Sequence, residues 1–200
     1  MREYHPPQQA RAIETERLLL ARFLEELERS GFAATNLSVV AKKAGVTRPG
    51  LLRRFGSKRG LLLVLYDRYC DDCVSQLERF KAGFQDYASL ASLIQHLYFA
   101  TERMHQDNYS LNLAMSQIYF DELSPENGTK RVFKAFLSLF QTLEENGWYN
   151  KNIDGTYAGI QIIISTSLNY TLGAMGGFPR DQNLRAKLVS RLVIEALRND

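Results

Sequence analysis

Residues 36–55 read NLSVVAKKAGVTRPGLLRRF, and this stretch decides the fold of the N-terminal part of the chain. Asn36 is a good helix N-cap, and the apolar residues behind it recur at helical spacing. Gly45 takes a positive φ without steric cost, so we expect it to end the first helix. Thr47 is suited to cap a second helix, whose first turn tolerates Pro49. The stretch therefore predicts two short helices joined by a tight turn.

The charge of this stretch is of one sign. Between residues 42 and 59 the chain has seven basic side chains and no acidic one. A solvated helical face usually mixes charges, so an unmixed basic run over two paired helices favours a polyanion as partner. The alternative is a basic surface without a partner, beside a helical hairpin whose only role is to pack within the fold. The basic residues are Lys42, Lys43, Arg48, Arg53, Arg54, Lys58 and Arg59.

Basic charge is concentrated at the N-terminal end of the whole chain. Residues 1–60 hold 12 Lys or Arg and 6 Asp or Glu, whereas residues 61–200 hold 13 and 16. A basic head on a mildly acidic body suits a protein that holds nucleic acid at one end. The first ten residues lack the apolar region of a signal peptide, and two cysteines in 200 residues make no disulfide framework. We therefore expect a cytoplasmic protein.

The rest of the chain shows helical periodicity throughout, which predicts an all-α fold of about nine helices. A first helix is expected over 11–30, with Ile13 turned inward, and Ser57 should cap a long fourth helix over 58–81. No Gly/Ser- or Pro-rich break follows it, so head and body should move as coupled rigid units. Further helices are expected near 89–106, 109–122 and 129–146. An uncharged helix should follow, capped by Asp154 and ended by Gly176-Gly177, and Asp181 should cap a last helix.

These elements divide the chain into a flexible arm over 1–10, a helix-turn-helix head over 11–60 and a body over 61–200. Segment 155–179 carries no charge but several polar side chains, so it suits a helix buried in protein better than a membrane span. Such a helix beside an amphipathic one has more apolar surface than one small body can cover. We therefore expect a homodimer through about 154–198; the alternative is a core helix of a monomer.

The N-terminal residues resemble the head of TetR-type transcriptional regulators over about 15–60. The resemblance implies that the second helix of the pair enters the DNA major groove and that the chain binds a palindromic operator as a homodimer. It further implies that the remaining helices form a ligand-sensing body, and hence a ligand-responsive regulator, which we expect to be a repressor. The residues that carry the resemblance are Gly31, Phe32, Thr35, Val40, Ala41, Ala44, Gly45, Val46, Thr47, Leu51, Phe55, Ser57 and Lys58.

The resemblance also implies which positions meet DNA. Departures from the family matter here, because it usually has Tyr where this chain has Leu52, often an aromatic residue or His where it has Arg54, and Thr or Ala where it has Gly50. Base readout at Gly50 would use only the backbone or DNA shape. The implied positions are Asn36 and Ser38 at the start of the supporting helix, Lys42 in the basic run, Thr47, Arg48, Pro49 and Gly50 at the reading end, and Arg53, Arg54 and Lys58 at the phosphates.

The body is rich in aromatic side chains, which suit a pocket for an apolar or aromatic effector. Amide side chains would supply its polar contacts. No cofactor is expected. The residues predicted to line the pocket are Tyr98, Gln117, Tyr119, Phe136, Phe140, Gln161 and Asn169.

Two spacings leave another class open, a small helical redox or metal-dependent enzyme or sensor. Cys70 and Cys73 form a C-x-x-C, but they lie in mid-helix, where the helix dipole does not lower a thiol pKa, and no second cysteine pair completes a zinc site. Glu102 and His105 have the Glu-x-x-His spacing of di-iron bundles, but the sequence holds no second copy. We therefore expect a non-enzymatic regulator without a metal site.

Overall fold

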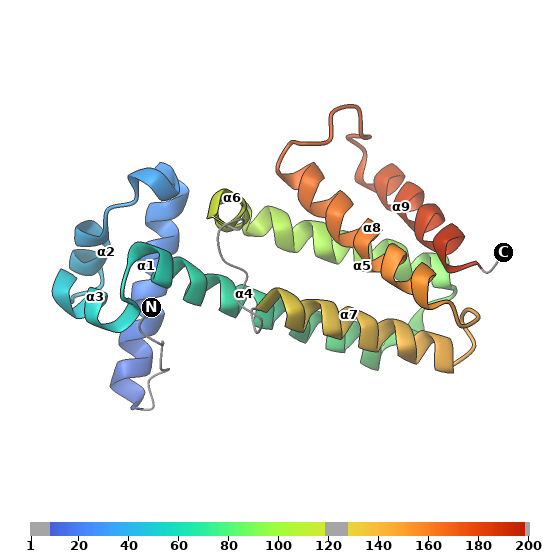
Figure 1. Cartoon of the computed structure of the whole chain (residues 1–200), viewed down its shortest axis with the longest axis horizontal. Helices are drawn as coiled ribbons and strands as arrows, with labels where there is room; N and C mark the ends of the chain where they lie inside the picture. The colour runs from blue at the N-terminus through green and yellow to red at the C-terminus, as the bar shows by residue number, and fades with distance from the viewer. Residues whose placement is uncertain (1–8, 119–127, 199–200) are drawn as a thin grey trace. The chain divides into compact units, whose positions relative to one another are not determined.

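The structure is a computed structural model that describes residues 9–118 and 128–198. Within these ranges it contains nine α-helices, one short 3-10 helix and no strand, so the all-α prediction is confirmed (Figure 1). None of the helices described there is both long enough and apolar enough to span a membrane.

The chain clusters into two compact units. The N-terminal unit comprises residues 1–69 and 110–123, and the C-terminal unit comprises residues 70–109 and 124–200. One helix, α4 (Lys58–Ala82), contributes residues to both units.

The N-terminal unit is built on a three-helix head. Its helices are α1 (Ala10–Ala34), α2 (Leu37–Lys43) and α3 (Arg48–Phe55), joined by the start of α4 and by α6 (Tyr109–Ile118). Gly31, with a φ of 72°, kinks α1 where the sequence predicts its end, and one further turn follows. Ile13 was expected inside but is 46% exposed. The buried core of the head consists of Leu19, Leu20, Phe23, Leu27, Val40, Leu51, Phe55, Leu61 and Leu62.

Short-range hydrogen bonds fix the ends of the paired helices. Asn36 Oδ1 accepts from the Ser38 N–H at 2.9 Å, and Thr47 Oγ1 accepts from the Gly50 N–H at 3.2 Å. Gly45 has a φ of 69°, which only glycine adopts readily, and it turns the chain between α2 and α3. These caps confirm the helix ends expected from the sequence.

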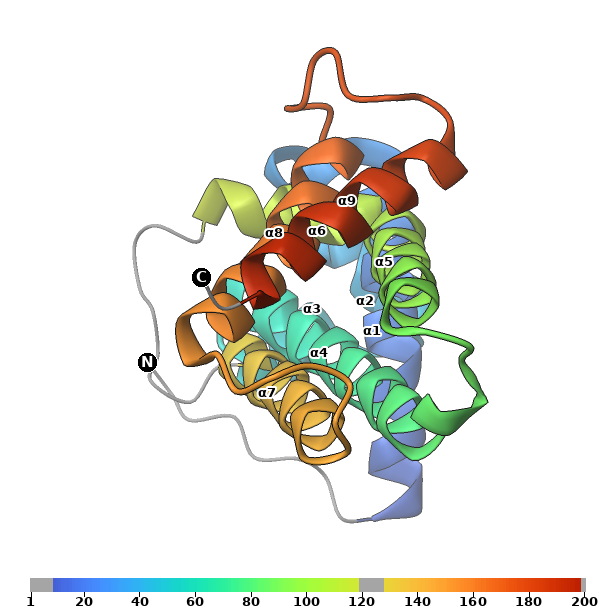
Figure 2. The same ribbon diagram turned by 90° about the vertical axis from the view of Figure 1, so that its right-hand side faces the viewer.

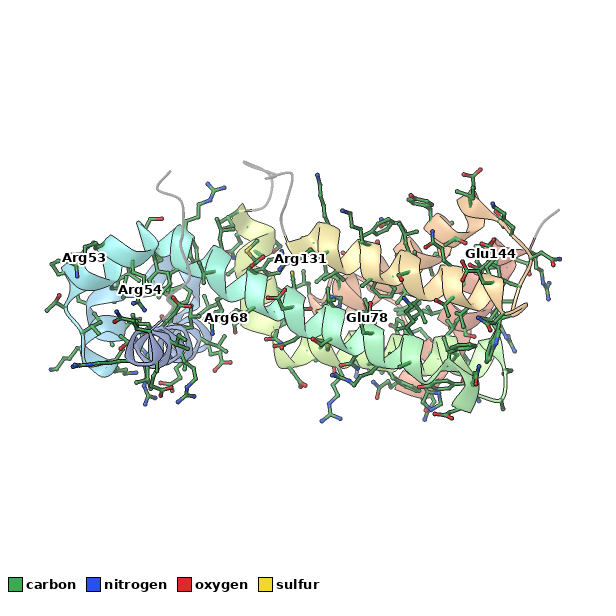
Figure 3. The ribbon with its side chains drawn as sticks, turned by 90° about the horizontal axis from the view of Figure 1, so that it is seen from below. Arg53, Arg54, Arg68, Glu78, Arg131 and Glu144 are labelled. Carbon is green, nitrogen blue, oxygen red and sulfur yellow. The ribbon has the colours of Figure 1, made fainter. Side chains whose placement is uncertain are left out.

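The C-terminal unit packs its last two helices on α5 (Leu90–Asp107). Figure 2 shows α8 (Ile153–Thr171) and α9 (Gln182–Leu197) side by side, and both contact α5. The remaining helix, α7 (Gly128–Glu145), runs beside α4 (Figures 1 and 3). The two are tied by Arg131 to Asp71 at 2.7 Å and by Lys81 to Ser138 at 2.8 Å. A short 3-10 helix, Phe84–Asp86, connects α4 to α5.

The start of α8 differs from the prediction. Its N-cap is Asn152, whose Oδ1 accepts from the Gly155 N–H at 2.8 Å. Asp154 lies in the first turn instead of capping the helix. The same Asn152 side chain donates to the carbonyl oxygens of Ala196 and Arg198 at 3.2 and 3.1 Å. Its selection as the cap therefore depends on α9 being in place.

The end of α8 also differs, because the helix stops before the predicted Gly176-Gly177. Gly173 has a φ of 73°, and its N–H donates to the Tyr170 carbonyl at 3.0 Å. The next N–H, of Ala174, reaches back to Asn169 at 2.8 Å. This pair of bonds is the Schellman arrangement that closes a helix at a left-handed glycine. The chain then forms a loop up to Asp181, which caps α9 as predicted.

Candidate nucleic-acid interface

Helix α3 has one buried and one exposed side. Leu51 and Phe55 are buried in the head and fix the rotation of the helix. The cap residue Thr47 and the first two helical residues, Arg48 and Pro49, are therefore exposed. The predicted reading end of the helix is open to a partner.

Three basic side chains of the head are exposed and unpaired. Lys42 at the end of α2, and Arg48 and Arg53 on α3, make no ion pair with any residue in the described ranges. Figure 3 shows Arg53 at the edge of the head. These three cations carry charge that folding has left uncompensated, so they can meet an external polyanion.

Arg54 does not share this exposure, which corrects its predicted place at a phosphate. Its Nη1 donates to the Ala12 carbonyl at 2.9 Å and lies 3.8 Å from Glu16 Oε2. The Glu16 carboxylate is fully buried and also accepts from Arg68 on α4 (Figure 3). Arg54 therefore joins α3 to α1, because a buried carboxylate requires nearby positive charge.

Lys58 is corrected in the same way. Its ammonium donates to the carbonyl oxygens of Phe32, Ala33 and Thr35 at 2.7, 2.9 and 3.4 Å. It also lies 4.9 Å from the centre of the Phe32 ring. A cation at the C-terminal end of a helix satisfies carbonyls that lack partners within the helix. Lys58 thus stabilises the end of α1, and its ammonium already has partners within the head.

A hollow of about 550 Å³ lies between α1 and the start of α3. Sequence reasoning missed the contribution of α1, because Thr15 carries no motif and lies about twenty residues before the paired helices. Asn36 and Ser38 are exposed at the start of α2, although the Asn36 amide oxygen is used in the cap. The hollow is lined by Thr15, Leu19, Val46, Thr47, Gly50, Arg53 and Arg54.

The residues predicted for an effector pocket do not come together. Tyr98, Phe136 and Phe140 belong to the packed core of the C-terminal unit. Gln161 and Asn169 lie on the exposed side of α8, because the opposite side of that helix faces the core. Of the other two, Gln117 is exposed on α6 in the N-terminal unit, and Tyr119 lies outside the described residues.

The Glu-x-x-His pair has other roles in the structure. Glu102 Oε1 accepts from Arg185 Nε at 2.8 Å and pairs with Arg185 Nη2 at 2.7 Å, and Oε2 accepts from Gln182 at 3.0 Å. Burial lowers the pKa of His105 to about 4, so this imidazole is neutral at pH 7. The Glu102 carboxylate is therefore paired with Arg185, a partner that sequence reasoning missed.

The C-x-x-C pair lies on α4. Cys70 is buried and Cys73 is half-buried, and the two thiols are not joined in a disulfide. Burial of a thiol in mid-helix suits packing better than reactivity.

The N-terminal part of the chain matches a known family in sequence, and the whole chain resembles solved structures. Residues 19–65 match the family model described as bacterial regulatory proteins, tetR family. A protein from Mesorhizobium loti assigned to the TetR family of transcriptional regulators has a similar structure, with a TM-score of 0.72 and 15% identity; the match covers 94% of this chain and 98% of that one.

Two similar structures are named FadR, a fatty acid degradation regulator from Bacillus halodurans and a transcriptional regulator from Bacillus subtilis. The protein from Bacillus halodurans has a TM-score of 0.65 and 15% identity over 97% of this chain and 100% of its own. The protein from Bacillus subtilis, in complex with stearoyl-CoA, has a TM-score of 0.61 and 15% identity over 91% and 99%. At this level of identity the likeness shows a common fold.

Proposed function

Because residues 19–65 form a TetR-family helix-turn-helix domain within a TetR-type fold, we propose that this protein is a ligand-responsive, DNA-binding transcriptional regulator. It acts as a repressor and binds an inverted-repeat operator as a homodimer. The observation that carries the proposal is the open side of α2 and α3, where three unpaired cations flank an exposed helix start. Phosphate contacts by such cations supply most of the affinity of a DNA-binding protein.

The proposed DNA contacts divide into two kinds. Arg48 stands at the first position of α3, where a guanidinium can reach a guanine edge in the major groove. Thr47, Pro49 and Gly50 approach the bases beside it. Lys42 and Arg53 hold phosphates, with Asn36 and Ser38 at the start of the supporting helix.

Replacing Arg48 by alanine is expected to weaken binding to the specific operator by about 1–3 kcal/mol and to relax one symmetric base position. The reason is the loss of a two-pronged hydrogen bond to one base. Arg53→Ala removes a phosphate contact and should weaken binding to all sequences about equally. Binding of each variant to operator and to random DNA measures the difference. Identical behaviour of the two variants on both DNAs would show that these roles are wrongly assigned.

The proposed dimer surface is the outer side of α8 and α9. Four large apolar side chains are exposed there: Ile153 at 60%, Tyr157 at 47%, Leu184 at 48% and Leu192 at 52%. The inner sides of the same helices pack on α5, and these outer residues stay largely exposed, although the Tyr157 ring lies 5.5 Å from that of Phe133. Association of two copies through 154–198 would remove this apolar surface from water.

Leu192→Glu is expected to convert the dimer into monomers and to weaken operator binding. A charge buried in an apolar interface is costly, and one head alone makes only half of the DNA contacts. Sedimentation of the variant at micromolar concentration measures its mass. The matched control is Ile13→Glu, which places the same charge at an exposed apolar residue of the head and should leave the dimer intact. A wild-type protein that sediments as a monomer would overturn the dimer.

Regulation is proposed to act through the spacing of the two heads. An effector bound among body residues 89–175 favours a dimer whose heads no longer match major grooves about 34 Å apart. The Bacillus subtilis FadR complex with stearoyl-CoA supports a ligand-binding body in this fold. The helix α4 runs unbroken from Lys58 to Ala82, so this single helix connects the head to the body and carries the coupling between them.

Linkage makes this mechanism measurable. If an effector weakens operator binding by a given factor, operator DNA must weaken effector binding by the same factor. Calorimetric titration of an effector with and without operator is expected to show this loss, while sedimentation shows an intact dimer. Equal effector affinities in the two titrations would contradict the mechanism.

A further inference from the structure

A hollow in the C-terminal unit opens where α8 gives way to the loop before α9. Its volume is about 590 Å³, which is within the range of small-molecule sites. One side is apolar and is formed by Tyr170, Met175 and Phe178. The Tyr170 and Phe178 rings lie 6.3 Å apart at an angle of 57°. This side suits a flat, apolar ligand.

The lining of the hollow also includes polar residues and a cation. Arg180 is exposed and makes no ion pair with any residue described in the structure. The neighbouring carboxylate of Asp181 is engaged at the start of α9, where Oδ1 accepts from the Leu184 N–H at 3.0 Å. Arg180 therefore keeps its positive charge available to a ligand.

An unused hydroxyl adds to these polar groups. Thr171 is one of the residues that line the hollow, and its Oγ1 is buried and has no hydrogen-bond partner among the described residues. Buried hydroxyls are nearly always paired in folded proteins, so an unpaired one at a hollow is what a missing ligand group would leave. The Gln106 amide is exposed at the same hollow.

The wall behind the hollow is braced by a buried ion pair. The Arg185 guanidinium lies 3.7 Å from the centre of the Tyr170 ring and is held by Glu102. Its Nη1 donates to the carbonyl oxygens of Pro179 and Arg180 at 2.8 and 2.6 Å. The aromatic wall and the loop that carries the free cation are thus fixed before any ligand arrives, which lowers the entropic cost of binding.

We propose that this hollow binds a small aromatic carboxylate. The ring of the ligand packs on Tyr170 and Phe178, and its carboxylate accepts hydrogen bonds from Arg180 and from the Thr171 hydroxyl. Binding itself does not depend on the role of the head. That this ligand regulates DNA binding rests on the function proposed above.

The test is equilibrium dialysis of the full chain against naphthoate, with naphthamide as the uncharged control of the same shape. We expect one naphthoate per chain, bound about tenfold or more tightly than naphthamide, because the guanidinium favours the carboxylate. Arg180→Gln should remove this preference and leave the weak binding of naphthamide unchanged. Arg103→Gln is the matched control, since Arg103 is an exposed arginine of α5 outside the hollow.

Three outcomes would overturn the proposal: no bound naphthoate at millimolar concentration, equal binding of the acid and the amide, or equal effects of Arg180→Gln and Arg103→Gln. The fluorescence of the single tryptophan, Trp148, reports whether each variant is folded. A protein that binds naphthoate but no DNA would refute the proposed function and leave the site standing. A protein that binds DNA but discriminates neither ligand would refute the site alone.

Discussion

Replacing Glu102 by alanine is expected to lower the free energy of unfolding of the C-terminal unit by about 3–5 kcal/mol. The Arg185 side chain is only 3% exposed, and Glu102 is its one carboxylate partner among the described residues. Without that partner the guanidinium stays buried and uncompensated, and its hold on the loop before α9 weakens. Urea unfolding followed by Trp148 fluorescence measures the change, because Trp148 packs edge-on against Phe84, with ring centres 5.8 Å apart, inside this unit.

Two further variants separate the ion pair from general damage to the fold. Glu78→Ala removes an exposed carboxylate of α4 (Figure 3) and should change stability by no more than about 0.5 kcal/mol. Glu102→Leu combined with Arg185→Met removes both buried charges and should recover most of the loss, because no charge is then left unpaired. If Glu102→Ala costs as little as Glu78→Ala, the buried pair does not stabilise the unit.

DNA affinity is expected to fall about a hundredfold between 50 and 200 mM salt, with a log–log slope of about −4. The estimate counts the two proposed phosphate contacts of each head, Lys42 and Arg53, in a dimer with two heads. Each phosphate contact releases condensed counterions, so affinity falls linearly on a log–log plot. Titration of labelled operator at several salt concentrations gives the slope directly.

The slope also tests which arginine of α3 reaches DNA. Arg53→Ala removes one phosphate contact per head and should make the slope shallower by about 2 in the dimer. Arg54→Ala should leave the slope unchanged and destabilise the head instead, because Arg54 bonds to Ala12 and lies beside Glu16. Equal effects of the two variants on the slope would restore the phosphate role of Arg54, and affinity that is indifferent to salt would refute electrostatic DNA binding.

The paired helices of the head could be predicted because their ends are set by hydrogen bonds within a few residues. Asn36 bonds two residues ahead and Thr47 three residues ahead. The positive φ of Gly45 is likewise a property of one residue. Such local choices survive in any tertiary context that keeps the helices, so capping rules find them.

The roles of the basic residues could not be predicted in the same way. Arg53 and Arg54 are adjacent in the sequence and chemically identical, yet one faces solvent and the other bonds to α1. The partner of Arg54 lies 42 residues away along the chain. A charge run shows how much basic charge is present, but not which cations form bonds within the fold itself.

The predicted effector pocket failed for a related reason. Aromatic content indicated a pocket, but Phe136 and Phe140 pack in the core, whereas Gln161 and Asn169 face outward on α8. Beyond Asp154 in its first turn, α8 carries no charged residue from which its inner side could be identified. The hollow at its end is instead formed by a loop whose position depends on Arg185 and Glu102, 83 residues apart.

The sequence by itself determined the helical fold, the caps of α2 and α3, and the basic character of the head, since each follows from neighbouring residues. Tertiary structure decided which side chains remain available for partners. Arg54 and Lys58 form hydrogen bonds within the head, and Asn152 caps the start of α8. Arg180 stays free beside the hollow. The physical reason is that a buried charge or an open helix end takes the nearest suitable group in space, whatever its distance along the chain.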